Sequence, residues 1–314
     1  MNKLATKTIN SRVLTHKPNL SIDKNKNYLF DLSYLGILDL QGEKAAEFLQ
    51  GQITCDVKQV TNTHMAQGLQ CNLQGRILSK MDVFFWNGLK ILLPKDLLTA
   101  TQKSLTKPAL LSKVTILENT EFMIFGFYLQ NPKDLILDCM DPRSIELLSL
   151  EGSMHGTDDY CIYHLGAGFY ICITRNDISN QFVEKDQFLG SYDWHSLRLE
   201  HKNIDIYPES KGLFLPHRLG LHTSGLISFN KGCYKGQEII ARTHYRATIK
   251  HELRLIELVG EVFSGQVLIH SETGLEVGEV VDYTRMNDDK YLVAASVLKE
   301  SDSSTLLCRL GLGS

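Results

Sequence analysis

The residues after Lys250 restrict the fold most, because they contain only short strand-like runs. Four such runs are separated by Gly, Asp and Asn, which favour turns: LRLIEL, QVLIH, LEVGEVVDY and YLVAASVL. This pattern is typical of a small all-β barrel or sandwich. The sequence therefore predicts a C-terminal β-barrel at residues 251–314, with a domain boundary near Lys250.

The first half of the chain mixes strands with helices. Residues 36–40 alternate like a strand, and residues 43–49 place apolar side chains on one helical face. Asn87-Gly88, which suits a type I′ turn, predicts a hairpin of residues 81–86 and 89–93. Further apolar runs precede a helix-like segment at 178–189, so a second α+β lobe is expected at residues 111–189.

Length and charge narrow the class of protein. The 314 residues suffice for two or three domains. Basic side chains number 33 and acidic ones 36, so the net charge of −3 does not favour direct binding of nucleic acid or anionic lipid. No apolar run reaches the roughly 18 residues that span a bilayer, and the basic first 22 residues are expected to form a disordered tail.

The seven cysteines point to a reducing compartment. They form no CxxC pair, which argues against a disulfide framework and against a self-contained metal site. Most lie in apolar runs and are expected to be buried, as at Cys161 and Cys172. The protein is therefore expected to be cytoplasmic.

The stretch KGCYKGQE, residues 231–238, is the strongest candidate for chemistry. Cys233 lies just before a helix predicted to begin near Gln237, and Lys231 and Lys235 add positive charge. The helix dipole and these charges favour the thiolate form of Cys233. Gly232 and Gly236 allow a tight bend. The alternative is a structural glycine turn in which a small cysteine fits.

Two other interpretations of this stretch are excluded, one by residue type and one by the number and spacing of ligands. A phosphate-binding P-loop needs Lys and Ser or Thr after its second glycine, and here Gly236 is followed by Gln237. A zinc site needs more ligands, and the spacing of His244 and His251 from Cys233 does not resemble one. Both histidines are interpreted as surface or turn residues. A cluster held jointly with a partner protein stays open.

The chain resembles a known family in several blocks that occur in order between residues 28 and 250. These blocks are residues 40–42, 48–54, 56–57, 75–76, 194–200, 231–238 and 240–242. They look like the YgfZ family, folate-binding relatives of the glycine-cleavage T-protein, an aminomethyltransferase. KGCYKGQE is the most specific of them.

The resemblance implies an α+β fold with three lobes around a folate channel. Its folate-binding lobe would comprise residues 20–110 and 190–250. Glu200 would accept two hydrogen bonds from a pterin, with Trp194 lining the pocket. The expected site residues are Trp194, Arg198, Glu200 and Asn72 for folate, Cys233 and Lys231 for catalysis, and Gly232, Tyr234, Gly236, Gln237, Glu238 and Arg242 in the motif loop. Without the resemblance, residues 194–200 would be an ordinary amphipathic helix with Glu200 in water.

The chain departs from the family in three places, of which Ala247, where the family commonly has glycine, says little about chemistry. The T-protein has a pair of aspartates where this chain has Ser79-Lys80, and Asp82 lies two residues out of register. One of those aspartates is the catalytic carboxylate of the transferase, so its absence disfavours aminomethyl transfer. After Glu200 the family usually continues with Ala-Gly, whereas this chain has His201-Lys202.

The leading hypothesis is a folate-binding accessory factor for the assembly or repair of iron–sulfur proteins, which would support transfer-RNA thiomethylation indirectly. Its expected cofactor is tetrahydrofolate or a derivative, with no metal site of its own. Its expected partners are iron–sulfur proteins or their assembly machinery, with no direct contact to nucleic acid or membrane. The alternatives are a folate-dependent one-carbon transferase and a folate-independent scaffold.

Overall fold

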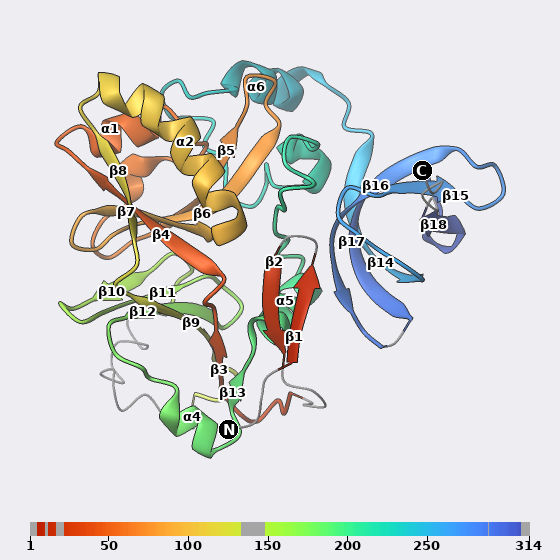
Figure 1. The fold of residues 1–314 in the computed structure, drawn as a ribbon. Helices are drawn as coiled ribbons and strands as arrows, with labels where there is room; N and C mark the ends of the chain where they lie inside the picture. Colours follow the sequence, from red (N-terminus) through yellow and green to blue (C-terminus); the bar gives the residue numbers. More distant parts are fainter. Residues whose placement is uncertain (1–4, 10–11, 17–21, 133–147, 288, 309–314) are drawn as a thin grey trace.

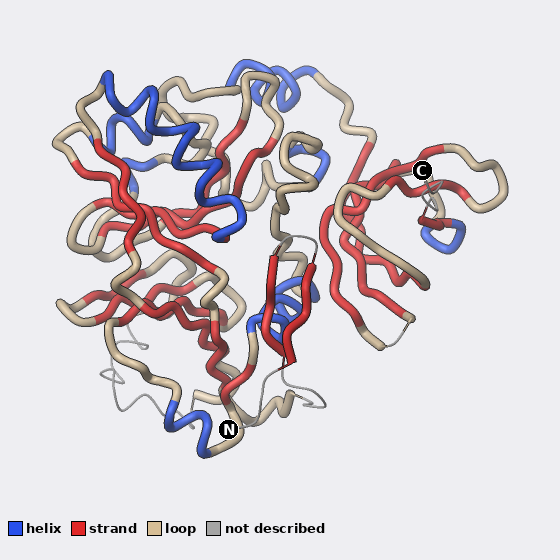
Figure 2. The backbone as a smooth tube through the Cα atoms, in the orientation of Figure 1, coloured by secondary structure: helices blue, strands red, loops and turns tan. Residues whose placement is uncertain are grey.

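Strands dominate the structure, a computed structural model that describes residues 5–9, 12–16, 22–132, 148–287 and 289–308 (Figure 1). The strands form four sheets, and the helices lie around them (Figure 2). Within the described residues, no helix is long and apolar enough to cross a membrane.

The first large sheet has five antiparallel strands in the order β5-β6-β7-β4-β8. They are β4 (Leu35–Gln41), β5 (Ala66–Cys71), β6 (Ile77–Phe85), β7 (Leu89–Pro94) and β8 (Thr115–Asn119). Asn87 and Gly88 both have positive φ between β6 and β7, which confirms the predicted hairpin. Helices α1 (Ala45–Gln50) and α2 (Lys95–Leu111) accompany this sheet, together with the short η1 (Val57–Gln59).

The second large sheet has six strands in the order β10-β11-β12-β9-β3-β13. They are β3 (Tyr28–Asp31), β9 (Met123–Tyr128), β10 (Met154–Gly156), β11 (Tyr160–His164), β12 (Phe169–Thr174) and β13 (Phe188–Leu189). The predicted helix at 178–189 is wrong in extent, because the segment divides into α4 (Asn180–Glu184) and β13. β13 is captured by parallel pairing with β3, a contact between distant residues that local periodicity does not reveal.

The C-terminal residues form a curled antiparallel sheet in the order β14-β17-β16-β15-β18 (Figure 1). Its strands are β14 (His251–Val259), β15 (Val267–His270), β16 (Glu276–Arg285), β17 (Lys290–Leu298) and β18 (Leu306–Cys308), with η3 (Ser303–Thr305) before the last. No strand pairing joins β14 to β18 within the described residues, so closure into a barrel stays a prediction. The domain boundaries likewise stay predictions.

The expected disordered N-terminal tail is wrong for the described residues. β1 (Ala5–Ile9) and β2 (Arg12–His16) form an antiparallel hairpin beside α5 (Ser191–Glu200) (Figure 1). Arg12 is buried and donates to Asp96 at 3.1 Å and to Asp205 at 2.7 Å. Burial alone would lower the pKa of Arg12, but Asp205, Tyr207 and Asp96 together outweigh it and raise the pKa. The basic residue therefore joins separate parts of the fold.

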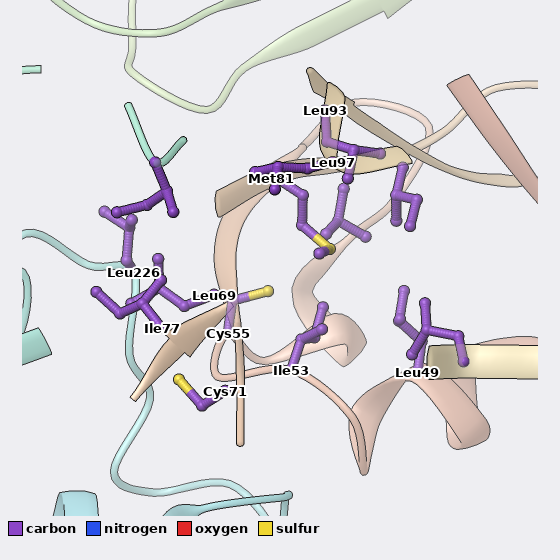
Figure 3. Close-up of a cluster of buried hydrophobic side chains, with 14 of the residues drawn as sticks. Leu49, Ile53, Cys55, Leu69, Cys71, Ile77, Met81, Leu93, Leu97 and Leu226 are labelled. Atoms are coloured by element: carbon purple, nitrogen blue, oxygen red, sulfur yellow. The ribbon is translucent and has the colours of Figure 1, made fainter. Parts of the chain in front are cut away.

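A hydrophobic core lies beneath the segment that carries KGCYKGQE. It includes Cys55 and Cys71, which are buried among leucine and isoleucine side chains (Figure 3). Tyr234 and Ile240 belong to the same core, so the motif and α6 (Gln237–Arg246) pack on the first large sheet, β5-β6-β7-β4-β8. The remaining short helix, η2 (Pro216–Leu219), also contributes a residue, Leu219.

Candidate functional site

Gly236 turns the KGCYKGQE loop into α6. The helix begins at Gln237, which confirms the predicted start, and Gly236 caps it with φ +84°. That left-handed conformation is costly for any residue with a Cβ. A Cβ here would also overlap the carbonyl oxygen of Asn72. Gly232 has no such constraint, since a Cβ there would meet no atom within 4 Å.

Three hydrogen bonds hold the loop, on both sides of its cysteine. The Lys231 ammonium donates to the carbonyl oxygens of Ile53 at 2.8 Å and Cys55 at 2.6 Å. The Lys235 backbone N–H donates to the Gly51 carbonyl at 3.1 Å. Burial lowers the pKa of Lys231 to about 8. Lys231 thus anchors the loop, and its effect on Cys233 stays a prediction.

Cys233 is exposed on this anchored loop. It is the one exposed cysteine among the six that the structure describes, and the predicted burial of Cys161 and Cys172 is confirmed. The adjacent Tyr234 is buried, and its backbone N–H donates to the Gln237 side chain at 3.3 Å. The loop therefore presents the thiol outward while the next side chain fills the core.

The remaining predicted loop residues and Asn72 surround the start of α6. Glu238 and Arg242 are exposed on the helix. Asn72 lies in the turn between β5 and β6, where its side chain accepts a hydrogen bond from the Arg76 backbone N–H at 2.9 Å. Asn72 thus lies beside the motif loop. It lines neither the cavity that contains Trp194 and Arg198 nor the cavity that contains Glu200.

Trp194 and Arg198 lie together on one face of α5. The Arg198 guanidinium is 5.7 Å from the Trp194 ring centroid. Trp194 is 1% exposed and packs between Phe30 and Phe169, with ring centroids 5.3 and 5.2 Å away. Both residues line a central cavity of about 50 Å³.

The central cavity contains charged groups that the site prediction missed. Lys80 and Asp82 point to the same face of β6 because they are two residues apart. The Lys80 ammonium donates to the Ile204 carbonyl at 3.2 Å. The pKa of Lys80 is lowered to about 8, mainly by burial and secondly by the charge of Arg198. Asp82 reaches the cavity without a slipped strand and accepts a hydrogen bond from Tyr163 at 3.0 Å.

Asp205 completes this charged group. Burial alone would raise the pKa of Asp205, but Arg12 and Lys80 outweigh it and lower the pKa. Its setting between Ile204 and Ile206 is the sequence signal that could have marked it, since a charge between two buried apolar residues requires a partner.

Glu200 lies on a different face of α5. It is exposed and lines a second cavity of about 540 Å³ together with Ile22, Lys24, Tyr128, Gln130, Asp193, Ser196, Leu197 and His201. Burial, followed by the Glu200 charge, raises the pKa of Tyr128. The volume falls in the range typical of small-molecule sites, and a carboxylate beside an aromatic ring suits a flat heterocycle with N–H donors. Trp194 and Cys233 do not line this cavity.

Metal ligands are not grouped in the described part of the chain. No set of three or more His, Cys, Asp or Glu residues there is arranged to hold a metal ion.

Comparisons with known proteins concern the family and the fold. The chain matches no family model. It is 29% identical over 249 residues to the tRNA-modifying protein YgfZ of Hamiltonella defensa, which covers 77% of this chain and 73% of that relative. It is 25% identical over 287 residues to the YgfZ protein of Colwellia psychrerythraea, which covers 88% and 87%. The resemblance to the YgfZ family is confirmed.

A solved structure has a similar fold. The glycine cleavage system aminomethyltransferase T of Bartonella henselae superimposes with a TM-score of 0.68, covering 91% of this chain and 82% of that one. Sequence identity is 15%, so this likeness concerns the fold alone. The predicted aminomethyltransferase-like α+β fold is confirmed, whereas the site residues that the YgfZ resemblance implied stay predictions.

Proposed function

We propose that this protein is a cytoplasmic, folate-binding accessory factor in iron–sulfur cluster assembly or repair, with Cys233 as its functional thiol. Through a cluster-dependent enzyme it would support transfer-RNA thiomethylation indirectly. The name of its relatives, tRNA-modifying protein YgfZ, supports the link to tRNA modification.

The exposed, anchored Cys233 is the observation that carries this proposal. Hydrogen bonds from Lys231 and Lys235 hold the loop. The loop precedes the N-terminus of α6, which is the positive end of a ten-residue helix dipole. A thiolate in such a position can bind a cluster iron or attack a sulfur atom. Cys233 is exposed, so a partner protein can reach its thiol.

The cavity beside Glu200 is the proposed folate site. The Glu200 carboxylate would accept hydrogen bonds from the pterin amino group and ring N–H, and Tyr128 offers an aromatic face. Folate in this position would not contact Trp194, which belongs to the core. This assignment therefore retains Glu200 from the predicted folate set and gives Trp194 a packing role.

The one-carbon transferase is the weaker candidate. Transfer from a folate nitrogen needs a group that handles a proton beside the carbon, and Ser79 and Lys80 replace the expected aspartates. Asp82 and Asp205 line the small central cavity, whereas the other carboxylate of the Glu200 cavity, Asp193, caps α5 by accepting a hydrogen bond from the Gly190 backbone N–H at 3.3 Å. The scaffold alternative predicts no saturable folate binding.

Replacing the thiol tests its role. In a bacterial strain that lacks its own YgfZ protein and therefore has little thiomethylated tRNA, the wild-type chain should restore the modification and Cys233→Ser should not. The matched control is Cys308→Ser, at a half-buried cysteine in β18. Full restoration by Cys233→Ser would refute the functional thiol.

Calorimetric titration with tetrahydrofolate tests the second half of the proposal. Wild-type protein should bind saturably, and Glu200→Gln should weaken binding by about tenfold or more, the loss expected for a charged hydrogen-bond partner. Glu272→Gln, at an exposed glutamate in the turn between β15 and β16, is the control. An equal affinity for Glu200→Gln and wild type would exclude this pterin site.

A further inference from the structure

A third cavity, of about 520 Å³, lies where the end of α5, η2 and the start of β14 meet. Neither the motif loop nor the pterin assignment uses it. Its volume is again in the range of small-molecule sites. The residues that determine its chemistry are His201, Lys202, His217, His222, Glu252 and Lys299.

The cavity carries a surplus of positive charge. Glu252 is its one acidic lining residue, and that carboxylate already accepts from Arg254 at 2.6 Å. Lys202 and Lys299 form no ion pair with any residue that the structure describes. Two unpaired ammonium groups facing one hollow attract an anionic ligand.

His217 adds an unsatisfied polar group to this surface. Its side chain is 2% exposed, and neither ring nitrogen has a hydrogen-bond partner among the described residues. Buried polar groups rarely lack a hydrogen-bond partner, and a group that does lack one can be a contact for a ligand. His222 stacks on the His217 ring at 4.7 Å and holds it in place.

The pKa of His217 is lowered to about 4, mainly by burial and to a smaller extent by the neighbouring His222 and His244. The ring is therefore neutral at pH 7 and retains one N–H that can donate to an anion.

Lys202 occupies an unfavourable backbone position. It follows the α5 C-cap, His201, with φ +59°, in the left-handed conformation that helices usually assign to glycine. A lysine there costs stability relative to glycine. The cost is consistent with a role for the ammonium group rather than for the backbone.

This cavity and the proposed pterin site adjoin at His201. His201 lines both the 520 Å³ cavity and the 540 Å³ cavity that contains Glu200. An elongated ligand could therefore place one end beside Glu200 and pass His201 to reach the two lysines. Folate is such a ligand, because its pterin is followed by one or more glutamate units with free carboxylates.

We propose that this cavity binds the carboxylates of the oligo-γ-glutamate tail of folate, with Lys202 and Lys299 as the charged contacts and His217 as a hydrogen-bond donor. The inference rests on the proposed function, because it assumes that the pterin lies beside Glu200. It assigns the chain a preference for polyglutamylated over monoglutamylated folate.

Calorimetry with the full chain tests this preference. The probes are the mono- and pentaglutamate forms of 5-formyltetrahydrofolate, which is chemically stable. The wild-type protein should bind the pentaglutamate about tenfold more tightly, as expected for two added charge-assisted contacts. Lys202→Gln/Lys299→Gln should lose that preference, so that the two forms bind the variant with equal affinity. Lys58→Gln/Lys103→Gln removes the same charge from exposed sites elsewhere and should keep the preference.

The outcomes separate the two proposals. If wild type binds both forms equally, or if Lys202→Gln/Lys299→Gln keeps the preference, the tail site is wrong while folate binding stands. If neither form binds, the proposed folate function itself fails. Inorganic phosphate distinguishes the source of the anion: phosphate binding that depends on the two lysines, without a pentaglutamate preference, would assign the cavity to phosphate and overturn the tail site.

Discussion

Replacing Gly236 by alanine should destabilise the protein through the KGCYKGQE loop. Gly236 has φ +84°, and the left-handed conformation costs an alanine about 1–2 kcal/mol. The new methyl group would also overlap the Asn72 carbonyl and lie 3.2 Å from the Gly75 Cα. Both neighbours are backbone atoms that cannot rotate away, and such overpacking costs about 1–3 kcal/mol more. The expected loss is therefore about 2–5 kcal/mol.

Gly232 provides the matched control in the same loop. It lacks a positive φ, and a methyl group there would meet no atom within 4 Å. Gly232→Ala should therefore change the free energy of unfolding by no more than about 0.5 kcal/mol. The two variants make the same chemical change four residues apart, so their difference reports the left-handed conformation of Gly236 together with its close contacts to Asn72 and Gly75.

Urea unfolding followed by circular dichroism measures both variants. With an m value of about 3 kcal/mol/M, Gly236→Ala should lower the midpoint by roughly 1 M, while Gly232→Ala should match wild type. In the complementation strain, Gly236→Ala should also reduce thiomethylated tRNA, because the loop that presents Cys233 is displaced. Equal midpoints for Gly236→Ala and wild type would refute the steric argument.

Three further predictions concern burial and backbone strain. Arg12→Met leaves Asp96 and Asp205 without their shared cation, so the free energy of unfolding should fall by about 3–5 kcal/mol in urea titrations, with exposed Arg246→Met unchanged. Below pH 6.5 the unfolded chain protonates His217 before the folded protein does, so stability should fall between pH 6.5 and 4 by up to about 3 kcal/mol. His217→Phe should flatten that part of the urea-midpoint profile against pH, and an unchanged slope would contradict the assignment. Lys202→Gly should raise the melting temperature by relieving about 1 kcal/mol of strain, whereas Lys202→Gln should not.

Local chemistry explains why some features could be predicted from the sequence. The Asn87-Gly88 hairpin and the start of α6 after Gly236 depend on residues that are neighbours in the chain, where glycine and asparagine restrict the backbone directly. The resemblance carried by KGCYKGQE likewise led to the correct fold, because that block is continuous.

The tertiary structure alone decided which distant charges meet. Arg12 was expected in a disordered tail, yet it is buried against Asp205, 193 positions away. α5 reads as one amphipathic helix, but folding divides it between two cavities, with Arg198 facing one and Glu200 the other. Lys202 and Lys299 are also distant in the sequence, and they line one cavity because the folded elements bring them together. A buried charge is tolerated only with its partner, and that partner is selected by the packing of whole elements, which leaves no local trace in the sequence.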